Sequence, residues 1–177
     1  MSFPAIQARP GIASCPPGDP ASERPPLVVF SSMRWHFDWQ RPQQLLTRLA
    51  MHYRVFHVEE PRATHRDAWL ECSAVADGVE LLVPHTRPDA PGLPDDPSRV
   101  VAGLLARFLR ARGVVAPLAW LDTPAALPLL ETLHPRGVVY DCREAPAAAG
   151  DDALLQRLLE RADVVLAGGP SLYESLR

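Results

Sequence analysis

The chain of 177 residues is long enough for one domain, with or without a tail. Its formal net charge of −3 excludes a basic face for nucleic acid and a polybasic membrane anchor. All 18 basic residues are arginine, which excludes chemistry that needs a Schiff-base lysine or a P-loop lysine.

The first part of the chain predicts a tail, a buried strand and a helix. Residues 1–26 are rich in Pro, Ala, Gly and Ser, which predicts a disordered tail. Leu27–Ser31 is a continuous apolar run, as in central parallel strands. After a polar loop, Pro42–Tyr53 shows the apolar stripe of a helix, with proline in its first turn. The next predicted strand, Val55–Val58, ends in Glu-Glu-Pro.

A hairpin, a loop and a second helix are predicted next. Trp69–Val75 and Val79–Pro84 flank an Ala-Asp-Gly turn, which is typical of a hairpin or of two neighbouring strands. The proline-rich residues 85–97 predict a surface loop. Ser98 is the expected cap of the helix that follows, and Gly113 is expected to end it.

A third strand and helix follow the same scheme. Leu118–Leu121 is a short apolar strand. Thr123 as cap and Pro124 in the first helical position predict the start of a helix, which Pro128 is expected to kink. Val138–Tyr140 is predicted to be the next strand.

The end of the chain completes the alternation of strands and helices. Asp151–Arg161 has the apolar spacing of a helix, and Asp163–Ala167 that of a strand. Ser171 and Glu174 then match a capping box. Alternating strands and helices imply parallel βαβ units. The predicted fold class is therefore α/β: a Rossmann-like three-layer α/β/α domain with a mainly parallel sheet.

Polar groups gather where the predicted strands end. These ends read SSMRW, EEP, DTP, DCRE and GGPS. Open α/β sheets bind ligands at the carboxyl ends of their strands. The loop Ser31–Arg41 combines aromatic and charged side chains, which suits a polyhydroxylated ligand such as a sugar. The alternative is that its tryptophans plug the top of the core.

Three runs of the sequence also resemble a known family. VVFSSMRWHFDWQRPQQLLTRLAMHYRVFHVEEP, VVYDCRE and LLERADVVLAGGPSLYESLR resemble the amino-terminal half of bacterial GT-B glycosyltransferases of the family 4-like kind. The nearest group carries RW-x-F-x-x-QRPQ-x-L. Its members are often encoded beside, or fused to, UDP-galactopyranose mutase in cell-envelope polysaccharide clusters. The resemblance covers about residues 27–177.

The resemblance implies a domain organisation and an activity. In this family two Rossmann-like domains face a cleft, and the first usually holds the acceptor while the second holds the nucleotide-sugar donor. Residues 27–177 would then be the acceptor-side domain, one half of a GT-B fold, with the carboxy-terminal donor domain absent. The implied reaction is hexosyl transfer in envelope or exopolysaccharide synthesis, and no activity is expected from this chain alone. The chain reads Arg-Glu-Ala-Pro after Cys142, where the group usually reads Met-Asp-Glu-Leu.

The residues expected to bind the acceptor lie at the strand ends. Arg34 and Arg41 are expected to grip acceptor hydroxyls, an acidic acceptor group or a donor phosphate. Alternatively, they are surface arginines paired with Asp38 or Glu60. The tryptophans are expected either to stack on a sugar or lipid or to plug the core. The full set of expected acceptor or cleft residues is Arg34, Trp35, Trp39, Gln40, Arg41, Glu60, Arg143, Gly168 and Gly169.

The candidates for an acid–base role are a histidine and three carboxylates. They are His36, Asp38, Asp141 and Glu144. As alternatives, the carboxylates cap helices or pair with arginines, and the histidine is an incidental loop residue. The two glycines offer amides to an anion or simply form a turn, and their spacing is not that of a dinucleotide site. No cluster has metal-ligand spacing, so no metal is expected.

Cofactor, partners and location follow from the same observations. No cofactor is expected in this chain, and a nucleotide-sugar donor is implied for the full-length enzyme. A sugar or glycolipid is the expected acceptor. Two other functions stay open: a non-catalytic module that binds a glycan or a partner such as the mutase, and a generic nucleotide-binding domain. Three widely spaced cysteines and the lack of a spanning apolar run favour the cytoplasm, free or at the inner membrane face.

Overall fold

A computed structural model describes residues 24–36, 41–87, 97–143 and 152–175. The strands are β1 Pro26–Ser31, β2 Arg54–Glu59, β3 Arg62–Ala63, β4 Trp69–Ala76, β5 Val79–Thr86, β6 Leu118–Leu121, β7 Gly137–Cys142 and β8 Val164–Ala167. The helices are α1 Arg41–Leu49, α2 Pro97–Ala111, the 3-10 helix η1 Pro124–Ala126, α3 Leu127–Leu133, α4 Asp152–Arg161 and α5 Pro170–Ser175.

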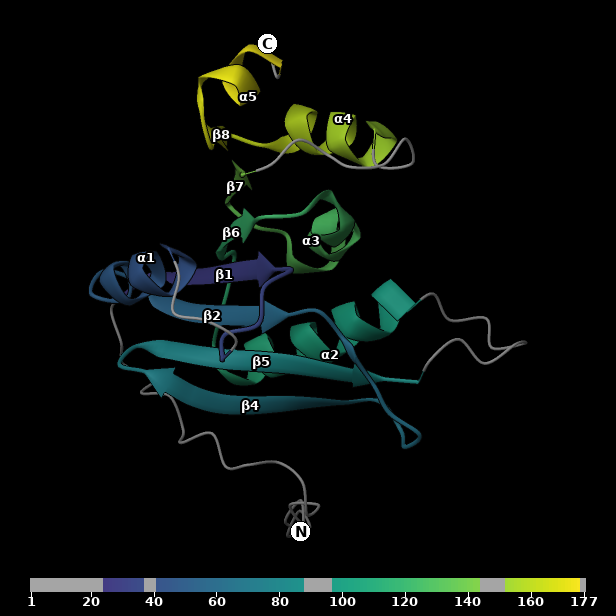
Figure 1. The fold of residues 1–177 in the computed structure, drawn as a ribbon. Helices are drawn as coiled ribbons and strands as arrows, with labels where there is room; N and C mark the ends of the chain where they lie inside the picture. The colour runs from purple at the N-terminus through teal and green to yellow at the C-terminus, as the bar shows by residue number, and fades with distance from the viewer. Residues whose placement is uncertain (1–23, 37–40, 88–96, 144–151, 176–177) are drawn as a thin grey trace, which may run out of the picture.

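Within the described residues the strands form one sheet of eight (Figure 1). Their order is β3-β5-β2-β1-β6-β7-β8, and β4 pairs antiparallel with β5 while the other pairings are parallel. The run β5-β2-β1-β6-β7-β8 repeats the doubly wound order of a Rossmann fold. Because this order reverses between β1 and β6, a crevice is expected at the carboxyl ends of these two strands. The predicted Rossmann-like α/β fold is confirmed.

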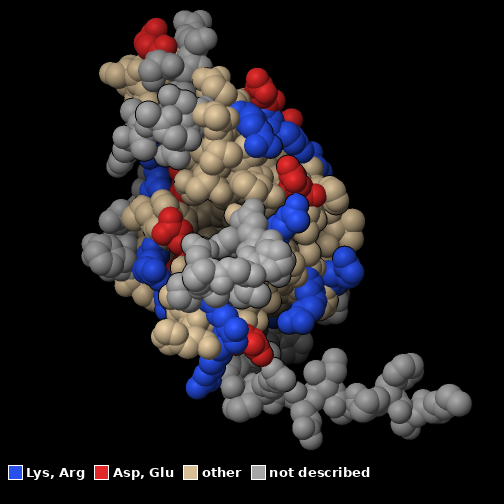
Figure 2. All heavy atoms as spheres, turned by 90° about the vertical axis from the view of Figure 1, so that its right-hand side faces the viewer, with Lys and Arg blue, Asp and Glu red and all other residues tan. Residues whose placement is uncertain are grey.

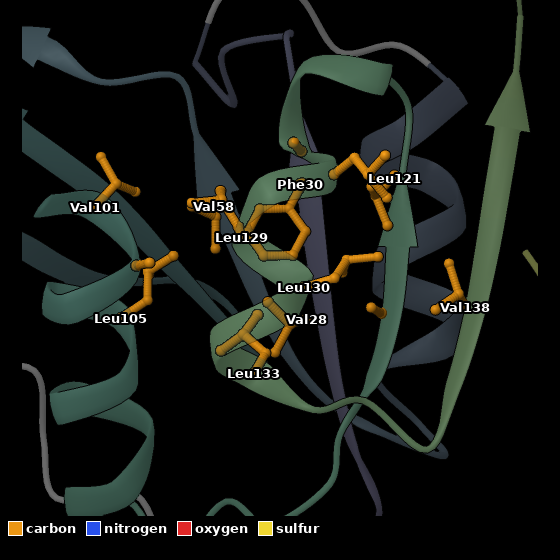
Figure 3. Close-up of a cluster of buried hydrophobic side chains, with 14 of the residues drawn as sticks. Val28, Phe30, Val58, Val101, Leu105, Leu121, Leu129, Leu130, Leu133 and Val138 are labelled. Carbon is orange, nitrogen blue, oxygen red and sulfur yellow. The ribbon is translucent and has the colours of Figure 1, made fainter. Parts of the chain in front are cut away.

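Helices cover both faces of the sheet, which makes three layers (Figure 1). On one face, α1 contributes Leu46 to a core that contains Val29 of β1. On the other face, α2, α3 and α4 pack against a larger core, which includes Phe30 and Leu105. Figure 3 shows side chains of α2 and α3 packed over the central strands in this second core. Alternation along β1 directs successive side chains to opposite cores, as expected for a strand buried on both faces.

Most predicted elements are confirmed, and several of their ends differ. The first helix ends at Leu49 instead of Tyr53, because the chain turns there so that β2 can start at Arg54. The second helix begins at Pro97, which places the expected cap Ser98 inside its first turn. The last helix begins at Pro170, so Ser171 does not act as the cap of the predicted box. The Thr123 cap is confirmed, since its hydroxyl accepts a hydrogen bond from the Ala125 amide.

The described residues begin before the predicted end of the tail. Arg24 donates a hydrogen bond from Nη1 to the carbonyl oxygen of Ala50 over 2.6 Å. The carbonyl of Pro25 accepts the amide of Arg54, and β1 begins at Pro26. The prediction of disorder is therefore wrong for residues 24–26, because backbone pairing with the start of β2 holds them. The remainder of the predicted tail, residues 1–23, lies outside the described residues.

A charged cluster ties α2 to the sheet at the amino ends of the strands. Arg112 Nη2 lies 3.0 Å from Glu80 Oε2 of β5, and both side chains are largely buried. The Arg112 guanidinium also stacks over the Phe108 ring. Burial raises the pKa of Glu80, and the charges of Arg112 and Arg54 partly oppose this rise. The carboxylate thus depends on its arginine partners to stay charged in this position.

Replacing Arg112 tests this dependence. Arg112→Met should lower the free energy of unfolding by about 1–3 kcal/mol, because it leaves a largely buried carboxylate without its partner. Arg110→Met, at an exposed position in the last turn of α2, should change it by less than about 0.5 kcal/mol. Urea unfolding of both variants measures the difference, and equal stabilities would show that the ion pair contributes nothing.

Candidate functional site

The loop that follows β1 is held by the carboxylate of Glu59, at the end of β2. Glu59 Oε1 accepts the Trp35 amide over 2.8 Å, and its side chain is only 1% exposed. Its other oxygen lies 3.1 Å from Arg62 Nη2 and 3.7 Å from Arg34 Nη1. Gln43 of α1 donates from Nε2 to the Trp35 carbonyl. Glu59 therefore satisfies a buried amide and partly neutralises two half-exposed arginines.

A second carboxylate, Asp122, holds the beginning of the same loop from the end of β6. Its Oδ2 accepts a hydrogen bond from the Ser31 hydroxyl over 2.8 Å, and its Oδ1 accepts the Ser32 amide over 2.9 Å. Arg143, after β7, places Nη2 2.6 Å from the same Oδ2. Asp122 thereby links the ends of three strands at the point where the strand order reverses.

Beside Asp122, on the α1 side of the sheet, lies a small cavity of about 20 Å³. This volume suits roughly one water molecule. His57, Asp122, Asp141 and Arg143 are among the residues that line it. Burial lowers the pKa of His57, although Glu59, the Met33 backbone and Asp122 act in the opposite direction. The imidazole is therefore neutral at physiological pH and packs edge-on against the Trp35 ring.

A larger pocket of about 330 Å³ lies on the other side of the sheet, between the ends of β1 and β2 and the starts of α2 and η1. Apolar side chains, among them Phe30 and Leu129, line it together with Ser98, Thr123 and the Glu59–Glu60 pair. Figure 2 looks onto the carboxyl ends of the strands and shows a hollow on this surface with charged side chains nearby. The pocket is lined by Phe30 of one core and the small cavity by Val29 of the other, so they lie on opposite sides of the end of β1, where Ser31 lines both.

The structure brings several predicted site residues to the carboxyl edge of the sheet, where the parallel strands end. Arg34 is half-exposed and pairs with Glu59, a partner that the sequence did not predict, while the expected partner Asp38 lies outside the described residues. Trp35 is 5% exposed and packed in the core, which favours the interpretation as a plug over a stacking platform. Asp141 is buried beside the small cavity, and Glu60 is exposed at the large pocket. Their roles in binding stay predictions.

Other predicted site residues cannot be placed at the site. Asp38, Trp39, Gln40 and Glu144 lie outside the described residues. Arg41 begins α1, but its side chain is not among those described. His36 is exposed at the end of the described part of the loop.

The glycine pair has a packing role at this edge. A Cβ on Gly168 would lie 2.8 Å from the carbonyl oxygen of Arg143, so a larger residue would push the two segments apart. The Gly168 amide donates to the Cys142 carbonyl, and it is therefore not available to an anion as expected. The Gly169 carbonyl accepts the Tyr173 amide at the start of α5. The simple turn is thus the better description of Gly168 and Gly169.

Sequence reasoning missed the residues that organise the site. Glu59, Asp122 and His57 were not candidates, although the first two stand in the strand ends EEP and DTP. Successive side chains of a strand point to opposite faces. Once the end of β2 is known, this alternation predicts that Glu59 points inward and that Glu60 is exposed. His57 stands inside the apolar run of β2, where a polar residue signals a specific environment.

Two absences hold for the part of the chain that is described. No group of three or more His, Cys, Asp or Glu side chains there is placed to hold a metal ion. None of the helices in the described ranges is long and apolar enough to cross a membrane.

The fold has counterparts among solved structures. Trehalose-6-phosphate synthase from E. coli, bound with UDP-2-fluoro glucose, superposes with a TM-score of 0.57 at 14% identity over 85% of this chain. A sucrose-phosphate synthase structure from Thermosynechococcus elongatus gives a TM-score of 0.52 at 14% identity, covering 86% of this chain and 81% of that one.

The comparisons show the kind of fold and how much of a similar protein this chain covers. This chain spans 41% of the length of the E. coli protein. No protein-family model matches the sequence. No curated protein matches it either. At this level of identity the likeness shows the fold alone: the chain has a Rossmann-like α/β fold of the kind found in GT-B glycosyltransferases.

Removing the Glu59 carboxylate should release the loop after β1. Glu59→Ala leaves the buried Trp35 amide without its acceptor. We therefore expect the free energy of unfolding to fall by about 1–3 kcal/mol and the hydrogen exchange of that amide to become faster. Glu60→Ala changes the neighbouring, exposed glutamate and should leave both quantities close to wild type. Amide exchange followed by NMR distinguishes the two variants. Unchanged exchange in Glu59→Ala would mean that packing alone holds the loop.

The lowered pKa of His57 predicts a pH dependence of stability. The unfolded chain binds a proton near the ordinary value of 6.5, whereas the folded chain resists protonation. The contribution of neutral His57 to the stability of the fold is therefore complete above pH 6.5. It decreases as the pH falls below 6.5 towards the lower pKa of the folded state. His57→Leu should unfold with a smaller decrease in Tm between pH 7 and pH 5 than wild type. His52→Gln, at an exposed position, should keep the wild-type slope.

Proposed function

We propose that this chain is the acceptor-binding domain of a sugar-nucleotide-dependent glycosyltransferase of the GT-B type. The observation that carries the proposal is the convergence of polar groups and a pocket at the carboxyl ends of β1 and β6, where a doubly wound sheet binds its ligand. The fold likeness to two sugar-transferring synthases supports the same class. Fold alone does not imply function, so the weight rests on the site.

The residues of this edge suit the binding of hydroxyl groups. Glu60 is the exposed carboxylate at the large pocket and can accept hydrogen bonds from a sugar. Arg34 and Arg62 pair with Glu59 and lie outside the described lining of the large pocket. Asp122 and Asp141 are buried, and Asp122 already accepts three partners. We therefore assign positioning to Asp122 and the two arginines, and ligand contact to Glu60.

The domain organisation is part of the proposal. Residues 27–177 would form the acceptor-side half of a GT-B enzyme, and a second Rossmann-like domain would supply the nucleotide-sugar site across a cleft. The chain spans 41% of the E. coli synthase, which is compatible with one domain of two. Glycosyl transfer needs an oriented acceptor and a stabilised diphosphate leaving group. This half would provide only the first of these.

The motif resemblance supports a narrower assignment. The run from Arg34 to Leu45 resembles the family 4-like enzymes of cell-envelope or exopolysaccharide synthesis, some of which accompany UDP-galactopyranose mutase. We propose the cytoplasm as its location and a sugar or glycolipid as its acceptor. In this setting the mutase is the proposed partner of the assembled enzyme. The alternative is a non-catalytic module that works without a donor domain and binds a glycan or a partner such as the mutase.

Ligand binding to the purified chain tests the proposal. Titration with methyl β-D-glucopyranoside should shift the amide NMR signals of Ser31–Met33 and Thr123, with weak, millimolar affinity, because in this proposal the chain provides one wall of the cleft. UDP should leave these signals unchanged, and UDP-glucose should yield no glycoside product. Saturable UDP binding at the same amides would instead identify a nucleotide-binding domain. Turnover of UDP-glucose by this chain would contradict the assignment to the acceptor half.

A further inference from the structure

We infer that the large pocket takes the apolar aglycone of an uncharged glycoside, so that the acceptor is a neutral amphiphile and not a sugar phosphate. This inference rests on the proposed function and names the acceptor class of its site. The pocket lies at the carboxyl edge between α2 and α3, on the opposite side of the end of β1 from the small cavity.

The floor of the pocket is apolar. Phe30 of β1, Val58 of β2, Val101 of α2 and Leu129 of α3 converge on it from four elements. Figure 3 shows these four side chains gathered at one end of the core, where the helices meet the strands. A bare sugar would place hydroxyl groups against this surface without hydrogen-bond partners, whereas an aliphatic group gains by leaving water. The floor therefore selects for the aglycone.

The charge around the pocket disfavours an anion. Among the described residues that line it, the charged ones are Glu59 and Glu60, and neither arginine nor histidine is present. The Glu59 carboxylate is engaged by the Trp35 amide and by two arginines, which leaves the exposed Glu60 as the charge that a ligand meets. A phosphate in this place would face the Glu60 carboxylate, and no cationic side chain is among the described residues that line the pocket.

The polar rim gives the sugar a place at the mouth. Ser98 at the start of α2, Thr123 before η1 and Glu60 stand at the polar side of the pocket. Hydroxyl groups of a pyranose can exchange hydrogen bonds with such groups while the aglycone points inward. The amino terminus of α2 attracts an anion, so a sugar phosphate is the competing ligand in the test.

Two glucosides and one sugar phosphate distinguish these possibilities. n-Octyl β-D-glucopyranoside, kept below its micelle concentration, should bind the purified chain at least about tenfold more tightly than the methyl glucoside. It should also shift the amide signals of Val58, Val101 and Leu129. Glucose 6-phosphate should bind no more tightly than the methyl glucoside. Isothermal calorimetry gives the affinities, and NMR gives the location.

Two variants control for nonspecific binding of the alkyl chain. Ala125 is exposed at the mouth, and Ala125→Trp should weaken octyl glucoside binding about tenfold by filling it. Ala111→Trp, at the exposed opposite end of α2, should leave binding unchanged. Equal octyl and methyl affinities, or tighter binding of glucose 6-phosphate, would overturn the aglycone site while the proposed function stands. Failure of every glucoside to shift the carboxyl edge would contradict both.

Discussion

Two buried carboxylates hold the loop after β1 against the end of the sheet, and the candidate site depends on them. Asp122 binds the start of the loop through Ser31 and Ser32, and Glu59 binds its middle through the Trp35 amide. Each carboxylate also meets arginine, which repays part of the cost of burying its charge. The loop is thereby shaped before any ligand arrives, as binding sites on rigid scaffolds require.

The position of β1 at the reversal of strand order gives this edge two unlike sides. On the α1 side a small cavity is surrounded by His57, Asp141 and Arg143. On the α2 and α3 side a larger pocket has an apolar floor and glutamates at its edge. The α1 side thus holds the loop, and the other side is open to a ligand. The end of β1 separates the charged residues that hold the loop from the surface proposed to bind the ligand.

The fold was largely predictable because apolar runs and turn residues are local signals. The boundaries of β6 and the Thr123 cap could be assigned from short windows of sequence. The site was less predictable because its contacts join distant residues: Ser31 meets Asp122 across 91 positions of sequence. Trp35 is a case where composition suggests two roles, and only the packing of its ring against His57 distinguishes them. The predicted end of the first helix was wrong because the tertiary contacts of Arg54 at the start of β2 outweigh the helical spacing of the apolar residues.

The central claim is that the ligand of this domain is a glycoside bound at the carboxyl ends of β1 and β6. A crystal structure of the chain with octyl glucoside tests it most directly. We predict the sugar beside Glu60 and Thr123, with the alkyl chain between α2 and α3 over Phe30. Density for the glucoside confined to the groove between α3 and α4, near His134 and Arg161, would contradict the claim.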